Sequence, residues 1–373
     1  MKTEKFAING IEYGSGRVFV IAEAGTSHGG DVSRAEELIH AAAEAGADCV
    51  KFQIVYADEI LHPNTGEVAL PGGNIRLYER FKELELPPSF FARLKESAER
   101  RGLVFLCTPF GLKSARELKA LRPQCVKIAS PELNFLPLLR EVASYGVPVF
   151  LSSGVSTLGG IEQALAVLGE SASRPLDICL LHCVTAYPAP EQDYNLRVLG
   201  NLSAIFGVPV GVSDHSLDPE LIPALGTALG AAAVEKHFCL SQSDPGLDDP
   251  IALPPDSFAR MVRAIRAVEK SGAGQTIDAL SRERGGELIR RILGDGVKRL
   301  APSEKANYAR TNRSVHAVQD IAEGQLIESG MVASLRSEKN LSPGLAPCWE
   351  GQIAGRKARR FIASGEGIQF EDV

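Results

Sequence analysis

The chain has 373 residues, of which 45% are hydrophobic and 23% charged, so it belongs with folded globular proteins rather than disordered or fibrous ones. Its 40 basic and 46 acidic residues give a net charge of −6, which argues against nucleic acid or an anionic membrane as the main partner. The apolar runs are shorter than the roughly 20 residues that span a bilayer, and residues 1–13 lack the apolar core of a signal peptide. We therefore expect a cytoplasmic protein without a membrane span. Its seven cysteines form no CxxC pair, so we expect buried thiols.

Between residues 18 and 269, a short apolar run followed by a segment of helical periodicity occurs eight times. The expected strands are residues 18–23, 48–53, 103–107, 125–129, 147–152, 177–182, 208–212 and 232–237. The expected helices are residues 34–45, 89–101, 112–121, 136–144, 158–168, 196–206, 220–229 and 256–270. Short runs rich in Val, Ile and Phe are typical of parallel strands buried on both faces, and eight such units can close into a (β/α)8 TIM barrel. An open doubly wound sheet is the alternative, but no GxGxxG follows the first strand.

Three other segments complete the predicted organisation. Residues 54–88 form a long loop after the second strand, which in a barrel usually shapes the substrate site. We assign residues 1–275 to the barrel domain and 276–311 to a connector with a helix at about 277–292. Residues 312–373 read as short β-like pieces and form a small second domain.

Polar residues occur at the end of every expected strand, where TIM barrels place their functional groups. In chain order they are Glu23 and His28; Lys51 and Gln53; Thr108; Lys127, Ser130 and Glu132; Ser152 and Ser153; His182, Thr185 and Tyr187; Ser213, Asp214 and His215; and Glu235, Lys236 and His237.

Two chemical features stand out among these residues. His215 and His237 end adjacent strands, and neutral imidazoles are common ligands of Mn²⁺, Fe²⁺ or Zn²⁺, although either could instead be a hydrogen-bonded core residue. Lys51 and Lys127, surrounded by Ser and Thr hydroxyls, suit a substrate that carries phosphate and carboxylate groups. Either lysine could instead form a Schiff base, as in an aldolase.

Several segments resemble the sialic acid synthase (N-acetylneuraminate synthase) family. They are IAEAGTSHGGD, CVKFQ, CTPF, VKIASPE, LSSGVSTL, LLHCVTAYPAP, VGVSDHSLD and VEKHF, in the order usual for that family. The tail segments NRSVHAVQDIAEGQLI and GRKARRFIASGEGIQFEDV resemble the antifreeze-like (SAF) domain that follows the barrel in the same family. The resemblance covers residues of about 15–373. It implies a TIM barrel followed by a small, β-rich SAF domain.

The resemblance implies condensation of phosphoenolpyruvate with an N-acetylated aldose, such as N-acetylmannosamine, to give a nonulosonic acid and phosphate. It implies that His215 and His237 bind Mn²⁺ or Mg²⁺ and that Glu23 handles protons at the reacting carbons. The implied phosphoenolpyruvate contacts are Thr108, Lys127, Ser130, Ser152, Thr185 and Ser213, and Glu132 is a further substrate-binding candidate. The implied sugar contacts are Lys51, Gln53, Tyr187 and Asp248, together with Arg313, which would reach the N-acyl group from the partner subunit of a domain-swapped homodimer.

The chain departs from the family pattern at three places. Ser27 and Gly29 stand where relatives usually have the two amides of NHNGD, and the tail reads EKNLSPG in place of GxGISP. In DPGLDDPIALPPD, the residues Asp249, Pro250 and Ala252 replace the usual His, Lys and Ser beside the sugar. A spore-coat or other nonulosonate synthase acting on a different acylated sugar is therefore a further reading, besides a Schiff-base aldolase and a non-catalytic sugar-binding protein.

Overall fold

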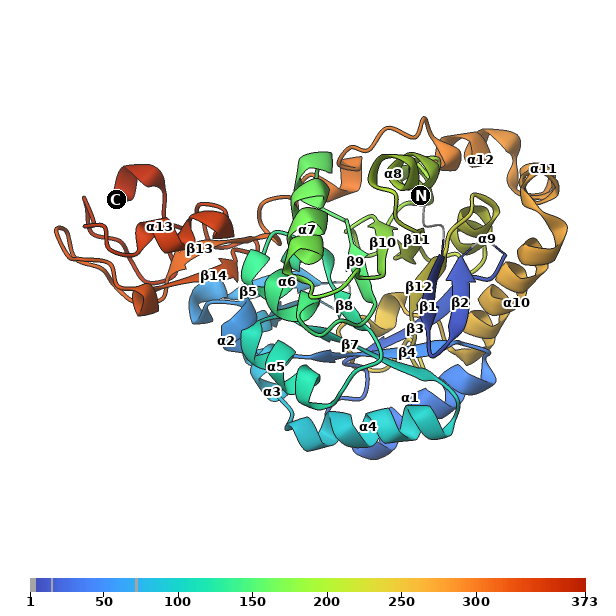
Figure 1. Ribbon diagram of the computed structural model, residues 1–373, viewed down its shortest axis with the longest axis horizontal. Coiled ribbons are helices and arrows are strands. Elements are labelled where there is room, and N and C mark those ends of the chain that lie inside the picture. Colours follow the sequence, from blue (N-terminus) through green and yellow to red (C-terminus); the bar gives the residue numbers. More distant parts are fainter. Residues whose placement is uncertain (1–4, 15, 71–72) are drawn as a thin grey trace.

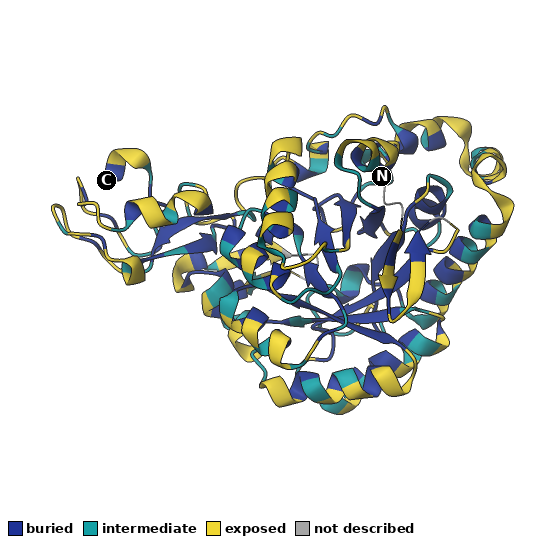
Figure 2. Ribbon diagram, in the orientation of Figure 1, coloured by how far each residue is buried: buried dark blue, intermediate teal, exposed yellow. Residues whose placement is uncertain are grey.

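All eight apolar runs form parallel strands in the computed structural model, which describes residues 5–14, 16–70 and 73–373 (Figure 1). The barrel strands are β3 (Phe19–Gly25), β4 (Cys49–Ile54), β7 (Val104–Pro109), β8 (Val126–Ile128), β9 (Val149–Ser152), β10 (Ile178–Cys183), β11 (Val210–Asp214) and β12 (Ala233–His237). Their order in the sheet is β7-β4-β3-β12-β11-β10-β9-β8, and β7 lies beside β8. The sheet therefore closes into the predicted TIM barrel, whose strands are buried on both faces (Figure 2).

A helix follows each strand within a few residues of the predicted position. These helices are α1 (Val32–Glu44), α4 (Pro88–Arg100), α5 (Leu112–Ala120), α6 (Leu136–Ala143), α7 (Leu158–Ser171), α8 (Val198–Phe206), α9 (Leu221–Ala228) and α10 (Pro255–Ser271). Their apolar faces pack on the barrel and their polar faces are exposed (Figure 2). The start of α1 is fixed by Asp31, whose carboxylate accepts hydrogen bonds from the backbone N–H groups of Ser33 and Arg34.

A β-hairpin that the sequence did not predict covers the amino end of the barrel. It consists of β1 (Lys5–Ile8) and β2 (Ile11–Gly14), paired antiparallel. The Phe6 ring lies 5.9 Å from the Phe19 ring and 5.2 Å from the Phe150 ring, measured between centroids. The hairpin thus closes the end of the barrel opposite the polar strand ends.

The long loop after β4 is folded. It contains α2 (Ala57–Ile60), the antiparallel strands β5 (Glu67–Leu70) and β6 (Gly73–Arg76), and α3 (Leu77–Glu83). A small apolar core that includes Ile60, Val68 and Phe110 holds these elements against the carboxyl end of the barrel. The loop therefore forms one wall of the opening at the carboxyl end of the barrel, which we call the mouth.

The connector contains two helices where one was predicted, α11 (Ala273–Arg284) and α12 (Gly286–Leu293). The break falls at Gly285, whose φ of +96° is open to glycine but costly for other residues. The C-terminal domain contains β13 (Arg313–Ala317), β14 (Val332–Arg336) and α13 (Glu350–Ile353) around its own apolar core. It lies beside the barrel, next to α2 and β5 (Figure 1).

The helices and the cysteines of the structure can be compared with what the composition predicted. Over the described ranges, no helix combines the length and apolar character needed to cross a bilayer. Six of the seven cysteines are buried free thiols, as predicted, whereas Cys348 is exposed.

Candidate active site

Two lysines and two glutamates meet inside the barrel at its carboxyl end. The Lys51 ammonium lies 2.8 Å from Glu23 Oε2 and 3.5 Å from Glu235 Oε1, and the Lys127 ammonium lies 3.3 Å from the same Glu235 oxygen. No side chain of the four is more than 6% exposed. Each charge therefore has a counter-ion within the group, and Glu235 is shared by both lysines.

The two lysines differ in how well their charge is compensated. Burial alone would lower the pKa of Lys51, but Glu23 and Glu235 outweigh burial and raise it. Burial lowers the pKa of Lys127, and Glu235, the one described carboxylate within ion-pair distance of its ammonium, only partly offsets this. Burial would raise the pKa of Glu235, but Lys127 and Lys51 outweigh it and lower the pKa to about 2. Lys127 is therefore the cation that would gain most from an added anion.

The predicted hydroxyls lie beside this cluster. The Lys51 ammonium donates to Thr108 Oγ1 at 3.4 Å, and Ser213 Oγ donates to Glu235 Oε1 at 3.0 Å. The hydroxyls of Ser152 and Thr185 are buried, and neither has a hydrogen-bond partner among the described residues. Since buried hydroxyls are usually paired, these two are suited to hydrogen-bond a ligand.

Gly154 lies where β9 enters its loop, between the hydroxyls of two predicted substrate contacts. Its backbone N–H donates to Ser130 Oγ at 3.0 Å. A Cβ at this position would collide with Thr185 Oγ1 and come within 2.9 Å of Ser130 Oγ. Glycine is therefore required by the close approach of the backbone to this hydroxyl pair.

We expect Gly154→Ala to lower the free energy of unfolding by about 1–3 kcal/mol, because the added methyl group overpacks a closed site. Gly159→Ala is the matched control, since a Cβ there meets open space within α7 and should raise stability by up to ~1 kcal/mol. Urea unfolding of both variants measures the difference, and equal stabilities would refute the steric role of Gly154.

The two predicted metal-binding histidines are neighbours at the mouth. Their ring centroids are 5.5 Å apart, and the Tyr187 ring stacks on His215 at 4.3 Å. His215 Nδ1 lies 2.8 Å from the Val184 carbonyl oxygen, which can only accept, so Nδ1 carries hydrogen and Nε2 is left for a ligand bond. Asp248 Oδ2 lies 3.8 Å from His237 Nδ1.

The protonation states of His215 and His237 determine how readily each ring can bind a metal. Burial lowers the pKa of His237 to about 3, which leaves the neutral ring that a metal requires. Burial would also lower the pKa of His215, but the charge and hydrogen bond of Cys183 raise it to about 9, so a metal would have to displace a proton there. No group of three His, Cys, Asp or Glu side chains in metal-binding geometry occurs in the described part of the chain. The pair fits an open site completed by water and substrate oxygen.

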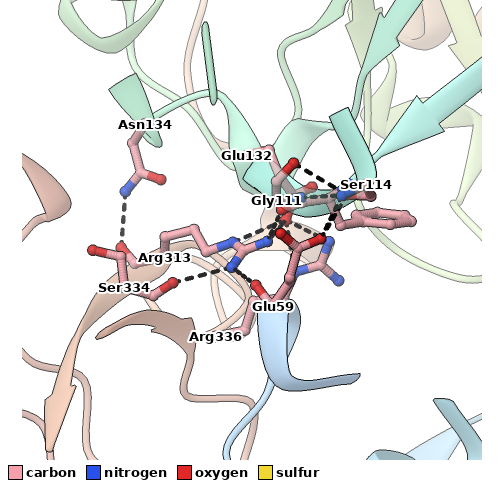
Figure 3. A network of polar contacts seen from close by, with 9 residues as sticks. Glu59, Gly111, Ser114, Glu132, Asn134, Arg313, Ser334 and Arg336 are labelled. Atoms are coloured by element: carbon pink, nitrogen blue, oxygen red, sulfur yellow. Dashed lines mark hydrogen bonds and ion pairs between the residues drawn. The ribbon is translucent and has the colours of Figure 1, made fainter. Parts of the chain in front are cut away.

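Glu132 is enclosed between two arginines of the C-terminal domain (Figure 3). Its Oε1 atom accepts from Arg313 Nε at 3.2 Å and from Arg336 Nη2 at 2.7 Å. The side chain of Glu132 is 0% exposed, that of Arg313 is 0% exposed and that of Arg336 is 13% exposed. The predicted substrate contact Glu132 therefore joins the two domains.

Arg313 is fully engaged by protein groups of its own chain. Besides Glu132, its guanidinium donates to the backbone carbonyls of Glu59, Phe110 and Ser334 (Figure 3). These four hydrogen bonds, with the contact of Nη2 to Glu132 Oε1 at 3.2 Å, engage all three guanidinium nitrogens, so Arg313 is directed at protein groups rather than at an acyl group here. Arg313 reaches the barrel of its own chain in this structure, and its action on a partner subunit stays a prediction.

The sequence placed Glu235 at a strand end but assigned it no role, and it gave no indication of Arg336. Strand alternation could have identified Glu235, because it places Glu235 and His237 on one face of β12 and Lys236 on the other. The structure agrees, since Lys236 Nζ contacts Asp214 Oδ2 at 2.5 Å, away from the lysine–glutamate cluster. No local signal marks Arg336, which reaches Glu132 across 204 positions of sequence.

Two of the departures from the family pattern contact each other. Ser27 Oγ donates to Asp249 Oδ1, and the Gly246 N–H donates to Asp249 Oδ2 at 2.8 Å. Asp249 is 0% exposed, so this substitution is directed into the loop packing rather than toward the mouth. In the segment EKNLSPG of the C-terminal domain, which also departs from the family pattern, Glu338 has a φ of +49°. This backbone conformation favours the glycine that is usual in that segment.

Comparison with known proteins identifies both parts of the chain. Residues 38–276 match the model of the NeuB family, and residues 312–373 match that of the SAF domain. An uncharacterized protein of Methanocaldococcus jannaschii is 36% identical over 99% of each chain. The N,N'-diacetyllegionaminic acid synthase of Legionella pneumophila is 32% identical over 98% of each. The crystal structure of the Bacillus subtilis spore coat polysaccharide biosynthesis protein SpsE is similar with a TM-score of 0.81 and 31% identity, covering 99% of both chains. The chain therefore belongs to the NeuB family and carries a C-terminal SAF domain.

Proposed function

We propose that the protein condenses phosphoenolpyruvate with an N-acylated aldose to give a nonulosonic acid and phosphate. The observation that carries the proposal is the pair of buried ammonium groups, Lys51 and Lys127, beside the unpartnered hydroxyls of Ser152 and Thr185. In the reaction, C3 of phosphoenolpyruvate forms a bond to the aldehyde carbon, one water is consumed, and phosphate leaves. Membership of a family that includes a nonulosonic acid synthase supports this chemistry over simple sugar binding.

The proposed roles of the site residues follow from their charge and their hydrogen-bonding groups. Lys127 has only one nearby carboxylate and neutralises the phosphate or carboxylate of phosphoenolpyruvate, while the hydroxyls of Ser152 and Thr185 orient it. Glu23 handles the proton at the reacting carbons and is held for this by Gln53, whose Nε2 donates to Glu23 Oε1 at 2.6 Å. Tyr187 forms an aromatic wall for the sugar beside His215.

A divalent metal, Mn²⁺ or Mg²⁺, would be held by His215 and His237 and would supply Lewis-acid polarisation of the sugar aldehyde. Electron paramagnetic resonance of Mn²⁺ titrated into the protein tests this without any turnover. We expect one bound ion per chain and affinity at least about tenfold lower in His215→Ala and His237→Ala. His40→Ala is the control, because its side chain is 48% exposed on α1. Unchanged Mn²⁺ affinity in both site variants would contradict the assignment.

The lowered pKa of Lys127 favours one alternative, a Schiff-base aldolase, because a buried lysine is more readily neutral and nucleophilic. Borohydride reduction in the presence of pyruvate distinguishes the two reactions. The condensation predicts no covalent adduct at Lys127, whereas a trapped pyruvyl-lysine would support the aldolase.

The proposal includes a homodimer in which the C-terminal domain can dock on either barrel. Glu132 and the carbonyls that bind Arg313 would be offered equally by an identical partner barrel, and residues 294–312 connect the domains. Mixing the inactive variants Glu23→Ala and Arg313→Ala, with exchange verified, should restore up to about a quarter of wild-type activity if docking occurs in trans. No recovery would indicate docking on the same chain.

A further inference from the structure

A second cavity lies outside the barrel lumen, between β10, α8, α12 and the segment that follows α12. Its volume is about 590 Å³, within the range of small-molecule sites. Hydrogen bonds from the backbone N–H groups of Leu196 and Arg197 to the carbonyls of Ile292 and Leu293 hold α12 against this side of the barrel. The proposed catalytic residues do not line the cavity.

Basic side chains dominate the cavity wall. Five basic residues line it, Arg197, Arg290, Arg291, Lys298 and Arg299, against the three acidic residues Asp193, Asp295 and Glu304. Glu304 is occupied by the backbone N–H groups of Val155, Thr185 and Ala301. Asp295 is paired with Arg299. The wall thus has a surplus of positive charge.

Three of these cations, Arg197, Arg291 and Lys298, form no ion pair with a described carboxylate, and Arg197 donates to the Gly294 carbonyl oxygen. Lys298 donates only to the Ser153 carbonyl oxygen, at 2.9 Å, and burial lowers its pKa. Neither Lys298 nor Arg291 forms an ion pair with any residue that the structure describes. The Glu304 carboxylate partly offsets the effect of burial on Lys298, but neither cation is held in an ion pair with a described residue. An ammonium and a guanidinium that line a cavity in this way favour an anionic ligand.

One residue of the cavity wall, His182, carries a buried acceptor without a donor in the described part of the chain. His182 is 4% exposed, and its Nε2 lies 2.6 Å from the Tyr194 carbonyl oxygen. Because a carbonyl only accepts, Nε2 carries the hydrogen and Nδ1 is the acceptor. Nδ1 has no partner among the described residues. A ligand hydroxyl would supply the missing donor.

We propose that this cavity binds a small phosphate ester that carries hydroxyl groups, such as a sugar phosphate. The phosphate dianion would pair with Lys298 and Arg291, and a hydroxyl would donate to His182 Nδ1. A carboxylate alone would leave part of the positive charge uncompensated.

The cavity wall is connected to the proposed phosphoenolpyruvate site. Glu304 accepts from the Thr185 N–H at 2.9 Å, and Lys298 holds the Ser153 carbonyl between Ser152 and Gly154. Ligand binding would therefore act on the backbone that positions these hydroxyls. This regulatory consequence rests on the proposed function, whereas binding itself does not.

Isothermal titration with ribose 5-phosphate tests the binding site. The titration is run in a Lys127→Met background as well as in the native chain, so that occupation of the barrel lumen is recognised. We expect one site per chain in both proteins, weaker binding of inorganic phosphate and no binding of ribose. Arg291→Ala should weaken ribose 5-phosphate about tenfold, by loss of a charge-assisted contact. Arg282→Ala should not, because this exposed arginine on α11 does not line the cavity.

Three results would overturn the proposal. They are absence of ribose 5-phosphate binding at millimolar concentration, loss of binding in Lys127→Met with retention in Arg291→Ala, and equal weakening by Arg291→Ala and Arg282→Ala. None depends on turnover, so failure of this proposal is distinguishable from failure of the synthase assignment.

Discussion

Lys127→Met is expected to raise the KM for phosphoenolpyruvate by roughly a hundredfold, which corresponds to about 2–3 kcal/mol for a contact between charged groups. Methionine retains the apolar part of the side chain but removes the less compensated of the two ammonium groups, Lys51 and Lys127, that lie inside the barrel. The KM for the sugar should change much less, because the expected sugar contacts, such as Lys51 and Tyr187, remain. Steady-state kinetics with each substrate varied in turn measures both effects.

The control variant Lys236→Met distinguishes a loss of phosphoenolpyruvate binding from a loss of stability. Lys236 is equally buried but lies on the other face of β12, where it pairs with Asp214 at 2.5 Å. Its loss leaves a buried carboxylate unpaired and should cost about 3–5 kcal/mol of stability, with little effect on the KM for phosphoenolpyruvate. If Lys127→Met and Lys236→Met change that KM equally, the assignment of Lys127 to the anion site is wrong.

Glu132→Gln is expected to destabilise the docked C-terminal domain by about 3–5 kcal/mol, because it leaves Arg313 and Arg336 buried without a counter-ion. The structural consequence is release of the domain from the barrel mouth while both cores stay folded. Limited proteolysis should then cut the connector faster, and urea unfolding should show separate transitions for barrel and domain.

Glu141→Gln provides the matched control. Glu141 also faces two basic side chains, Arg116 at 3.6 Å and Lys119 at 4.0 Å, but at the surface. Its replacement should cost no more than about 1 kcal/mol and leave the cleavage rate unchanged. Equal effects of Glu132→Gln and Glu141→Gln would show that the buried carboxylate does not hold the domains together.

The barrel was predictable because its signals are local. Each strand is a short apolar run, and each helix shows its own periodicity, so the eight strand–helix units could be placed within a few residues. The hairpin of β1 and β2 gave no such signal, since each strand has four residues and its stability comes from Phe6 packing on Phe19 and Phe150. The break at Gly285 lies inside a helical pattern that continues on both sides.

The same distinction between local signals and contacts of distant segments applies to the site. The lysines, hydroxyls and histidines at strand ends could be predicted because barrel topology brings those ends together. The enclosure of Arg313 could not, because three of its acceptors, Glu132, the Glu59 carbonyl and the Phe110 carbonyl, are distant from it in sequence. The contact between Ser27 and Asp249 could not be predicted for the same reason, although each residue was recognised as a departure from the family pattern.

The reaction itself tests the proposed condensation. The protein is incubated with phosphoenolpyruvate, Mn²⁺ and a panel of aldoses, among them N-acetylmannosamine, a di-N-acetylated hexose and the unacylated parent sugars. Released phosphate and product mass are measured together. We expect phosphate release that depends on an N-acylated aldose and equals the amount of a product whose mass is that of the aldose plus pyruvic acid. Phosphate release without this product, or no reaction with any N-acylated aldose, would contradict it.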